Sequence, residues 1–217
     1  MTFPVQRTKF NIDPELEFQW EWFDKDYFIS KDGTKEFPEH HCKVTWTASQ
    51  PHIQRFRNAV DIGCRDGEYT RYLHKYFNHT YCFDYRSRKL FPRNVDLTKV
   101  THFRCGLGEE HKVIKVSGSG SMTSERGRKK EDWIDEEIFT LDQFNLPDID
   151  YIKIDVDGFE LRVLQGSIKT IKTYSPIVVL EAENNEMSAI NFMEKEFNYG
   201  VVAWDSGKRN VVMKENK

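Results

Sequence analysis

Residues 59–67 read Ala-Val-Asp-Ile-Gly-Cys-Arg-Asp-Gly, and this stretch decides the fold of the chain. A short apolar run leads into a turn with glycines at positions 63 and 67, and an amphipathic segment follows at 68–77. The pattern predicts a strand, a tight turn and a helix, because glycine adopts backbone angles that other residues resist. Parallel sheets commonly bind nucleoside-containing ligands at such a turn, because the free N–H groups at the start of the helix point toward the ligand.

The spacing of the glycines leaves more than one interpretation open. Dinucleotide-binding proteins use Gly-x-Gly-x-x-Gly, whereas Gly63 and Gly67 are four residues apart and Asp61 precedes the first by two. A turn of this kind can also be purely structural. A nicotinamide-dependent oxidoreductase and a non-catalytic module with the same fold therefore remain alternatives to another nucleoside-cofactor enzyme.

The composition describes a chain of 217 residues with 31% charged residues and a formal net charge of −3. This length fits one domain with a short appendage. The balanced charge argues against a protein that coats nucleic acid. No apolar run approaches the roughly 18 residues of a membrane span, and the first residues lack a signal-peptide pattern. We therefore expect a cytoplasmic protein without a membrane segment.

The four cysteines are predicted to be reduced thiols of the core. Cys42, Cys64, Cys82 and Cys105 show no Cys-x-x-Cys spacing, and the last three lie in or beside predicted strands. Neither a disulfide nor a zinc site is expected from this arrangement.

Short apolar runs alternate with amphipathic segments along most of the chain. This alternation predicts a doubly wound, mostly parallel sheet covered by helices on both faces, with an antiparallel hairpin at 201–212 as its edge. The predicted strands are 59–64, 80–84, 100–105, 150–155 and 176–182, with shorter ones at 111–116 and 138–141. The predicted helices are 51–57, 68–77, 87–91, 159–172 and 187–197.

Two regions differ from this pattern. Residues 1–50 are rich in aromatic side chains among charges, and we interpret them as an irregular extension ahead of a domain at 51–217, with one short helix near Pro14. The extension either anchors to the sheet, covers the substrate pocket or forms a contact in a homodimer. Residues 117–132 are small, polar and then strongly charged, which predicts either a solvated loop or a loop over the site.

Acidic residues end several predicted strands. Asp84 follows the glycine turn by about 20 residues, where an acid accepts hydrogen bonds from ribose hydroxyls. Asp155 ends a central strand, where doubly wound proteins place ligands, and it could bind a cofactor or a metal or act as a base. Asp157 is expected to cap the helix that begins at residue 159. A purely structural role as a helix cap is the alternative for Asp84 and Asp155.

Lys153 is unusual in a buried strand, because a buried ammonium is costly without a partner. It shares a face with Asp155, since alternate residues of a strand point to the same side. This spacing predicts an internal ion pair, with a lysine that polarises an acceptor hydroxyl as the alternative. Glu181 and Glu183 end the next strand near the same edge, where they could serve as a general base, a cation ligand or a helix cap.

Taken together, these segments resemble the FkbM family of S-adenosylmethionine-dependent methyltransferases over residues 58–184. Residues 60–67 resemble the family's cofactor turn, Asp-x-Gly-x-Asn-x-Gly, with Arg65 in place of the usual Asn. Residues 105–108 resemble the segment that borders the adenine, and residues 140–142 match Thr-Leu-Asp. The most specific piece is 152–166, which is similar to Lys-Ile-Asp-Val-Glu-Gly-x-Glu-x-x-Val-Leu-x-Gly, with Asp157 in place of Glu.

The resemblance implies a seven-stranded, Rossmann-like class I methyltransferase sheet and methyl transfer to a hydroxyl of a sugar, glycan or small natural product. The implied cofactor is S-adenosylmethionine, with S-adenosylhomocysteine as product and a divalent cation left open. The candidate catalytic residues are Asp155 as first base, Glu183 as second, and Lys153, and Asp155 would be the ligand of any cation. The candidate cofactor-binding residues are Asp61, Gly63, Cys64, Arg65, Gly67, Asp84, Tyr85, Gly106, Leu107 and Asp155.

The expected partner is a small-molecule or glycan acceptor, and nucleic acid is not expected. The chain lacks the Asn-Pro-Pro-Tyr, Asp-Pro-Pro-Tyr and Pro-Cys motifs of base methylation. Methylation of a ribose hydroxyl remains an alternative, since the basic residues at 126–130 could contact phosphates.

Overall fold

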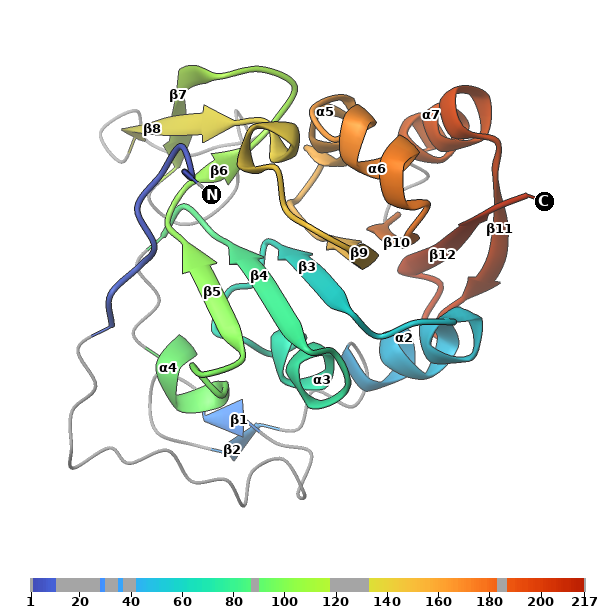
Figure 1. Ribbon diagram of the computed structural model, residues 1–217, viewed down its shortest axis with the longest axis horizontal. Coiled ribbons are helices and arrows are strands. Elements are labelled where there is room, and N and C mark those ends of the chain that lie inside the picture. The colour runs from blue at the N-terminus through green and yellow to red at the C-terminus, as the bar shows by residue number, and fades with distance from the viewer. Residues whose placement is uncertain are drawn as a thin grey trace.

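A seven-stranded sheet forms the centre of the computed structural model, which describes residues 2–10, 28–29, 35–36, 42–86, 90–117, 133–182 and 187–216 (Figure 1). The strand order is β11-β12-β10-β9-β3-β4-β5, and only β12 runs against its neighbours. The doubly wound sheet with an antiparallel edge is therefore confirmed. The strands are β3 (Asn58–Ile62), β4 (His79–Phe83), β5 (Val100–Phe103), β9 (Ile149–Ile154), β10 (Ile177–Glu181), β11 (Tyr199–Trp204) and β12 (Asn210–Glu215).

The order of the strands reverses between β3 and β9. β3 leads to β4 and β5 on one side, whereas β9 leads to β10 on the other. Doubly wound proteins bind ligands outside the carboxyl ends of the strands at such a reversal. The glycine turn follows β3 and Asp155 follows β9, so the topology brings these two motifs together.

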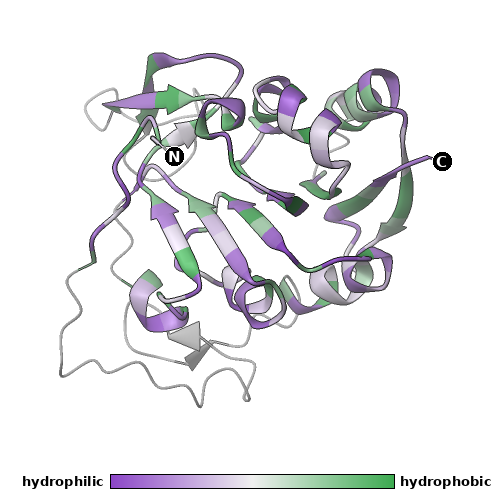
Figure 2. Ribbon diagram, in the orientation of Figure 1, coloured by the Kyte–Doolittle hydropathy of each residue, from purple (hydrophilic) through white to green (hydrophobic). Residues whose placement is uncertain are grey.

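Helices cover both faces of the sheet, with α5, α6 and α7 on one face and α2, α3 and α4 on the other (Figure 1). The helices carry hydrophobic and hydrophilic segments, as expected for elements with one face on the sheet (Figure 2). Their bounds are α2 (Cys42–Ser49), α3 (Thr70–Tyr76), α4 (Phe91–Asn94), α5 (Glu160–Gln165), α6 (Ile168–Tyr174) and α7 (Met187–Phe197), with 3-10 helices η3 (Gln50–His52) and η5 (Leu141–Phe144).

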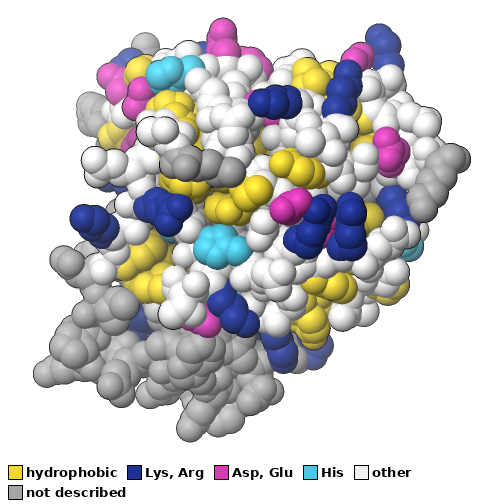
Figure 3. Space-filling model, in the orientation of Figure 1, with side chains coloured by type: hydrophobic (Ala, Val, Ile, Leu, Met, Phe, Trp, Pro, Cys, Tyr) yellow, Lys and Arg dark blue, Asp and Glu magenta, His cyan; other side chains and the backbone are white. Residues whose placement is uncertain are grey.

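Each face of the sheet has its own apolar core. Ile62, Ile154 and Leu164 belong to the core under α5–α7. Leu73 and Val179 belong to the core under α2 and α3. On the face seen in Figure 1, hydrophobic side chains reach the surface only in small groups between charged and polar ones (Figure 3). Scattered groups of this size are normal for a folded domain.

A second sheet of three strands follows the carboxyl end of β5. Its strands are β6 (Gly106–Leu107), β7 (Lys112–Ser117) and β8 (Trp133–Phe139), in the order β6-β8-β7. β7 confirms the strand expected at 111–116, and β8 begins earlier and ends earlier than the strand expected at 138–141. Most of the predicted loop at 117–132, including its basic residues, lies outside the described residues.

The helix expected at 51–57 is wrong. α2 ends at Ser49, the short η3 turn carries Pro51, and the backbone is extended at Ile53. The helix forms earlier because Trp46 is buried against the ring of Tyr76, with 5.0 Å between the ring centroids. This packing joins segments far apart in the chain, and no local pattern shows it.

The single helix expected at 159–172 is two helices, α5 and α6, which separate at Gly166. A Cβ there would lie 1.9 Å from the carbonyl oxygen of Gly108, so the break allows the two backbones to touch. Asp142 stabilises the start of α6 from outside the helix. Its carboxylate accepts hydrogen bonds from the N–H groups of Lys169 at 2.9 Å and Thr170 at 2.8 Å. The Thr-Leu-Asp motif thus has a structural role.

Residues 2–10 contact the sheet at its β5 edge, and α2 packs against β11 and β12. The N–H of Thr8 donates to the carbonyl of His102 at 2.7 Å, and β1 (Phe28–Ile29) pairs with β2 (Lys35–Glu36). The helix expected near Pro14, and residues 87–89 of another, lie outside the described residues. All four cysteines are free thiols; Cys64, Cys82 and Cys105 are buried in the core as predicted, whereas Cys42 is half-buried. Within the described ranges, no helix has the length and apolar character needed to cross a membrane.

Candidate active site

The turn after β3 is hydrogen-bonded to both neighbouring strands. The N–H of Gly63 donates to the carbonyl of Phe83 at 2.9 Å, and the N–H of Asp155 donates to the carbonyl of Ile62 at 3.0 Å. Gly63 has a φ of +83°, and a Cβ there would lie 1.8 Å from the carbonyl oxygen of Asp155. Both the backbone angle and the available space therefore require glycine.

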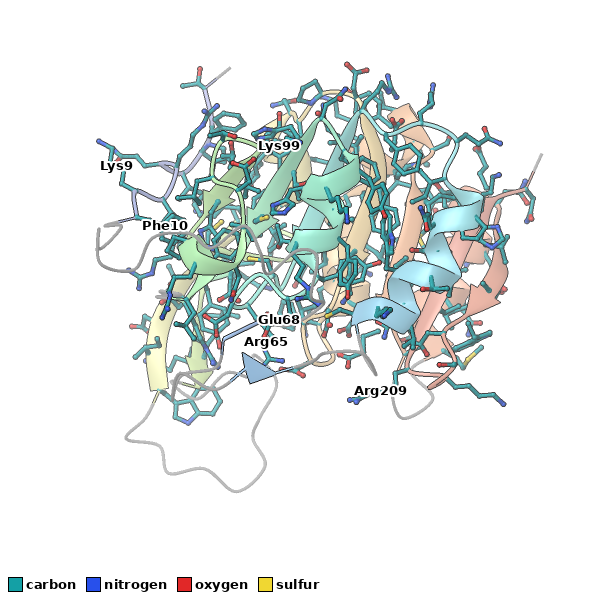
Figure 4. The ribbon with its side chains drawn as sticks, turned by 90° about the horizontal axis from the view of Figure 1, so that it is seen from below. Lys9, Phe10, Arg65, Glu68, Lys99 and Arg209 are labelled. Atoms are coloured by element: carbon teal, nitrogen blue, oxygen red, sulfur yellow. The ribbon has the colours of Figure 1, made fainter. Side chains whose placement is uncertain are left out.

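Arg65 also has a left-handed backbone, with a φ of +47°. Asn tolerates this region better than most other residues, which explains why the Asn usual in the FkbM pattern suits the turn. The exposed side chain of Arg65 lies with Glu68 at the carboxyl-end edge of the sheet, whereas Lys99, which precedes β5, lies at the opposite edge (Figure 4). Gly67, with a φ of +90°, packs against Val95.

Asp84 lies beside this turn, at the carboxyl end of β4. Its Oδ2 accepts the N–H of Arg65 at 3.1 Å, and its Oδ1 accepts the N–H of Arg86 at 2.8 Å. The neighbouring Tyr85 is buried, and its hydroxyl accepts a hydrogen bond from the Arg86 guanidinium at 3.2 Å. Because a carboxylate oxygen can accept more than one hydrogen bond, this fixed orientation suits recognition of ligand hydroxyls.

Lys153 occupies the centre of a charged cluster on the α2–α3 face. Its side chain is 5% exposed, and its Nζ donates to Oδ2 of Asp155 at 2.6 Å. Asp61 is the partner of Lys153 in the register of β3 and β9, so both point to this face. Burial acts to lower the pKa of Lys153, but Asp155 and Asp61 raise it and keep the ammonium charged. The predicted internal ion pair is confirmed.

Asp61 is an interior member of this cluster. Its carboxylate is buried and accepts a hydrogen bond from Oγ1 of Thr70 at 2.6 Å, which ties β3 to α3. Burial raises the pKa of Asp61 to about 6, although Lys153 and Thr70 act in the opposite direction. Asp61 therefore lies beneath the turn rather than at its surface.

Asp155 and Glu181 lie at the carboxyl ends of the neighbouring parallel strands β9 and β10, where the two carboxyl groups influence each other's ionisation. Burial acts to raise the pKa of Asp155, but Lys153 and the hydrogen bond with Glu181 lower it. Burial, together with the charge of Asp155, raises the pKa of Glu181 to about 9. These influences favour the protonated form of Glu181 and the ionised form of Asp155.

Glu160 holds the loop after β9, a role that the sequence motifs did not predict. Its buried Oε1 accepts the N–H groups of Val156 at 3.0 Å and Gly158 at 3.3 Å. The cap expected from Asp157 is wrong, because the N-cap position of α5 is Phe159 and Asp157 is exposed in the loop. The sequence signal for this role was an acidic residue in the first turn of the helix that follows Gly158.

The other candidate cofactor residues lie around the same edge. Gly106 and Leu107 form β6 and pair with β8. Cys64 is buried beside Cys82 in a small apolar cluster, and burial raises the pKa of its thiol. Glu183, the second catalytic candidate, lies outside the described residues.

No metal-binding cluster is present in the part of the chain that the structure describes. Groups of three or more His, Cys, Asp or Glu side chains that could hold an ion are absent there. The positive charge among the carboxylates comes instead from the Lys153 ammonium. The divalent cation left open by the sequence therefore has no ligand set among these residues.

Replacement of Glu181 by Gln is expected to raise thermal stability, and to raise it more at pH 8 than at pH 5. A Glu side chain ordinarily ionises near 4.5, whereas folded Glu181 keeps its proton up to about pH 9. Between these values the wild type takes up a proton on folding, so its stability falls as the pH rises, and Gln has no such dependence. Melting temperatures of both proteins across this range measure the difference, and a constant difference would contradict a protonated Glu181.

The fold and this edge together define a class of protein. The sheet order with one antiparallel strand, the glycine turn after β3 and the acid after β4 are those of a Rossmann-like methyltransferase. Residues 37–201 match the methyltransferase FkbM domain. The chain belongs to this family.

Solved structures share the fold at low sequence identity. Methyltransferase FkbM from Methylobacillus flagellatus KT has a TM-score of 0.56 and 16% identity. The match covers 78% of this chain but only 47% of that longer chain. Precorrin-6y C5,15-methyltransferase from Geobacter metallireducens GS-15 has a TM-score of 0.50 and 15% identity, with 89% and 96% of the two chains covered. Precorrin 8w decarboxylase from Methanobacterium thermoautotrophicum has a TM-score of 0.50 and 14% identity, and the match covers 88% of this chain and 98% of that chain. No curated protein matches the sequence.

Proposed function

We propose that the protein transfers a methyl group from S-adenosylmethionine to a hydroxyl oxygen of a sugar, a glycan or another small compound. The observation that carries this proposal is the ionised Asp155, paired with Lys153 and placed against the glycine turn where the strand order reverses. Membership of the FkbM family supports methyl transfer, and the chemistry of Asp155 supports oxygen as the acceptor atom.

The residues at this edge fit a cationic nucleoside cofactor. Asp84, oriented by two backbone N–H groups, would hold the ribose hydroxyls beside the glycine turn that follows β3. Gly106 and Leu107 would border the adenine. Asp155 and Asp61 together outnumber the single charge of Lys153, which suits a positive sulfonium. Such a cofactor supplies an electrophilic methyl group when bound.

Asp155 would accept the proton of the acceptor hydroxyl. An alcohol is a weak nucleophile until it loses that proton, so a base within hydrogen-bond reach is needed. The Asp155 side chain is 36% exposed and ionised, and the bond from Lys153 fixes the direction of its carboxylate. Lys153 acts in this scheme as a positioning residue, and Glu183 remains the second candidate for the base.

The Asp84→Ala variant is expected to bind S-adenosylhomocysteine about 5- to 150-fold more weakly than the wild type. This range corresponds to about 1–3 kcal/mol for the loss of charge-assisted hydrogen bonds. Calorimetric titration of both proteins measures the change. Asp135→Ala is the matched control, because that carboxylate is exposed and pairs with Lys115 on the second sheet. Equal affinities of the Asp84 variant and the control would place the ribose elsewhere.

A methylation assay against a panel of hydroxyl compounds tests the proposed reaction. The purified protein is incubated with methyl-labelled S-adenosylmethionine and mono- and oligosaccharides or small natural products. We expect label in one class of acceptor, with NMR of the product showing a methyl ether. Label attached to nitrogen or carbon would contradict oxygen as the acceptor atom.

A further inference from the structure

Arg65 occupies a backbone position that does not favour arginine. Its φ of +47° lies in the left-handed region, which Asn tolerates better than a long side chain does. Asn is also the residue usual at this place in the FkbM turn, so the arginine is a departure of this chain from the pattern. Unfavourable backbone angles that persist at a binding turn indicate a task for the residue that adopts them.

The guanidinium of Arg65 is available to a ligand. The side chain is exposed at the carboxyl-end edge of the sheet (Figure 4), and within the described ranges it forms no hydrogen bond or ion pair. Two other positive groups near this edge already have partners, since Lys153 donates to Asp155 at 2.6 Å and Arg86 donates to the hydroxyl of Tyr85 at 3.2 Å. Arg65 therefore presents a positive charge that no protein group compensates by direct contact.

Arg65 lies between the two acids that are proposed to face the ligand. Its N–H donates to Oδ2 of Asp84 at 3.1 Å, which fixes the residue beside the end of β4. Its positive charge also helps to lower the pKa of Asp155 at the end of β9, so the guanidinium is near that carboxylate as well. The strand order β9-β3-β4-β5 places the turn after β3 between these two ends.

The strand order also gives a bound adenosine compound a direction. With the adenine beside Gly106 and Leu107, which follow β5, and the ribose at Asp84 after β4, the rest of the ligand extends toward β3. This follows because the base and the carbon that carries the sulfur are attached to the ribose on opposite sides of the ring oxygen. The amino-acid part of the cofactor, with one ammonium and one carboxylate, therefore reaches the turn that carries Arg65.

The charges of the site suit only some groups of that ligand. Asp61, Asp84 and Asp155 favour its ammonium and its sulfonium, but they repel its carboxylate. A guanidinium can donate two parallel hydrogen bonds to a carboxylate and balances its charge, whereas the amide of Asn carries no charge. Arg65 thus supplies the one complement that the acids do not.

We propose that the guanidinium of Arg65 binds the amino-acid carboxylate of the cofactor and so selects S-adenosylmethionine and S-adenosylhomocysteine over adenosine compounds that lack this carboxylate. This inference rests on the proposed function and assigns a specificity-determining contact within that site. An anionic group on the methyl acceptor is the other possible source of the same chemistry. Affinity for the cofactor alone distinguishes the two sources, because no acceptor is then present.

Calorimetric titration of the wild type and the Arg65→Asn variant tests this contact. The two ligands are S-adenosylhomocysteine and its decarboxylated analogue, which keeps the ammonium and lacks only the carboxylate. The variant is expected to bind S-adenosylhomocysteine about 5- to 50-fold more weakly than the wild type, and the analogue within about twofold of the wild type or more tightly. Its melting temperature should not fall, because Asn suits the left-handed backbone.

Two further variants separate the charge of Arg65 from other effects. Arg55→Asn is the matched control, because that arginine is exposed, precedes β3 and pairs with Asp150, and its loss should leave both affinities unchanged. Arg65→Lys keeps a positive charge without the planar pair of donors, and it should bind S-adenosylhomocysteine more tightly than Arg65→Asn does. A lysine variant no better than the asparagine variant would contradict a contact that depends on charge.

The pattern of the affinities decides between the inference and its alternatives. Equal binding of S-adenosylhomocysteine by the wild type and Arg65→Asn would overturn the inference and leave an anionic acceptor as the partner of Arg65. Equal weakening of both ligands would also overturn it, because the carboxylate would then not be the group that Arg65 contacts. Failure of S-adenosylhomocysteine to bind the wild type would instead refute the proposed function.

Discussion

The Asp155→Asn variant is expected to lose methyl transfer by about 10²- to 10⁴-fold while it keeps its fold, since an amide cannot accept the proton of the acceptor hydroxyl. The amide oxygen can still accept the hydrogen bond from Lys153, and Asp61 continues to balance the buried ammonium. Initial rates with saturating cofactor measure the loss, and circular dichroism measures the fold.

The Asp135→Asn variant provides the control for this loss. It carries the same chemical change on an exposed carboxylate of β8, which pairs with Lys115. The control is expected to keep the activity of the wild type. If the Asp155 variant keeps it too, Asp155 is not the base, and Glu183 becomes the leading candidate.

The Gly63→Ala variant is expected to lose about 2–6 kcal/mol of its free energy of unfolding. The added Cβ would lie 1.8 Å from the carbonyl oxygen of Asp155, and the φ of +83° is unfavourable for alanine. Backbone strain and overpacking each cost about 1–3 kcal/mol. Urea denaturation measures the change, which is a large part of the roughly 5–15 kcal/mol typical of a domain.

Gly207→Ala is the matched control for the effect of a new methyl group. Gly207 lies in the turn between β11 and β12, and a Cβ there would lie 3.7 Å from its nearest neighbouring atom, an ordinary contact. Its replacement should change the free energy of unfolding by less than about 0.5 kcal/mol. Similar values for the two variants would show that the backbone at Gly63 does not contact Asp155 closely.

The sequence was sufficient for those elements whose signal is local. The helix at 187–197 and the hairpin at the end of the chain follow from periodicity and turn residues, and the structure places them where they were predicted. The helix α2 and the break at Gly166 were missed, because Trp46 and Gly166 are explained by contacts with Tyr76 and Gly108, distant in the chain.

One part of the charged site could also be predicted from a local signal. Alternation within one strand was enough to pair Lys153 with Asp155. The position of Glu160 under the loop and the proton on Glu181 depend instead on distances between separate elements. These distances became available only with the register of β9 and β10.

Calorimetric titration with S-adenosylhomocysteine, with NADH in a parallel experiment, tests the assignment of the cofactor most directly. The edge formed by Asp84, the turn at Gly63 and Asp155 is expected to give saturable binding of S-adenosylhomocysteine and none of NADH. Binding of NADH alone would contradict the methyltransferase assignment and favour an oxidoreductase.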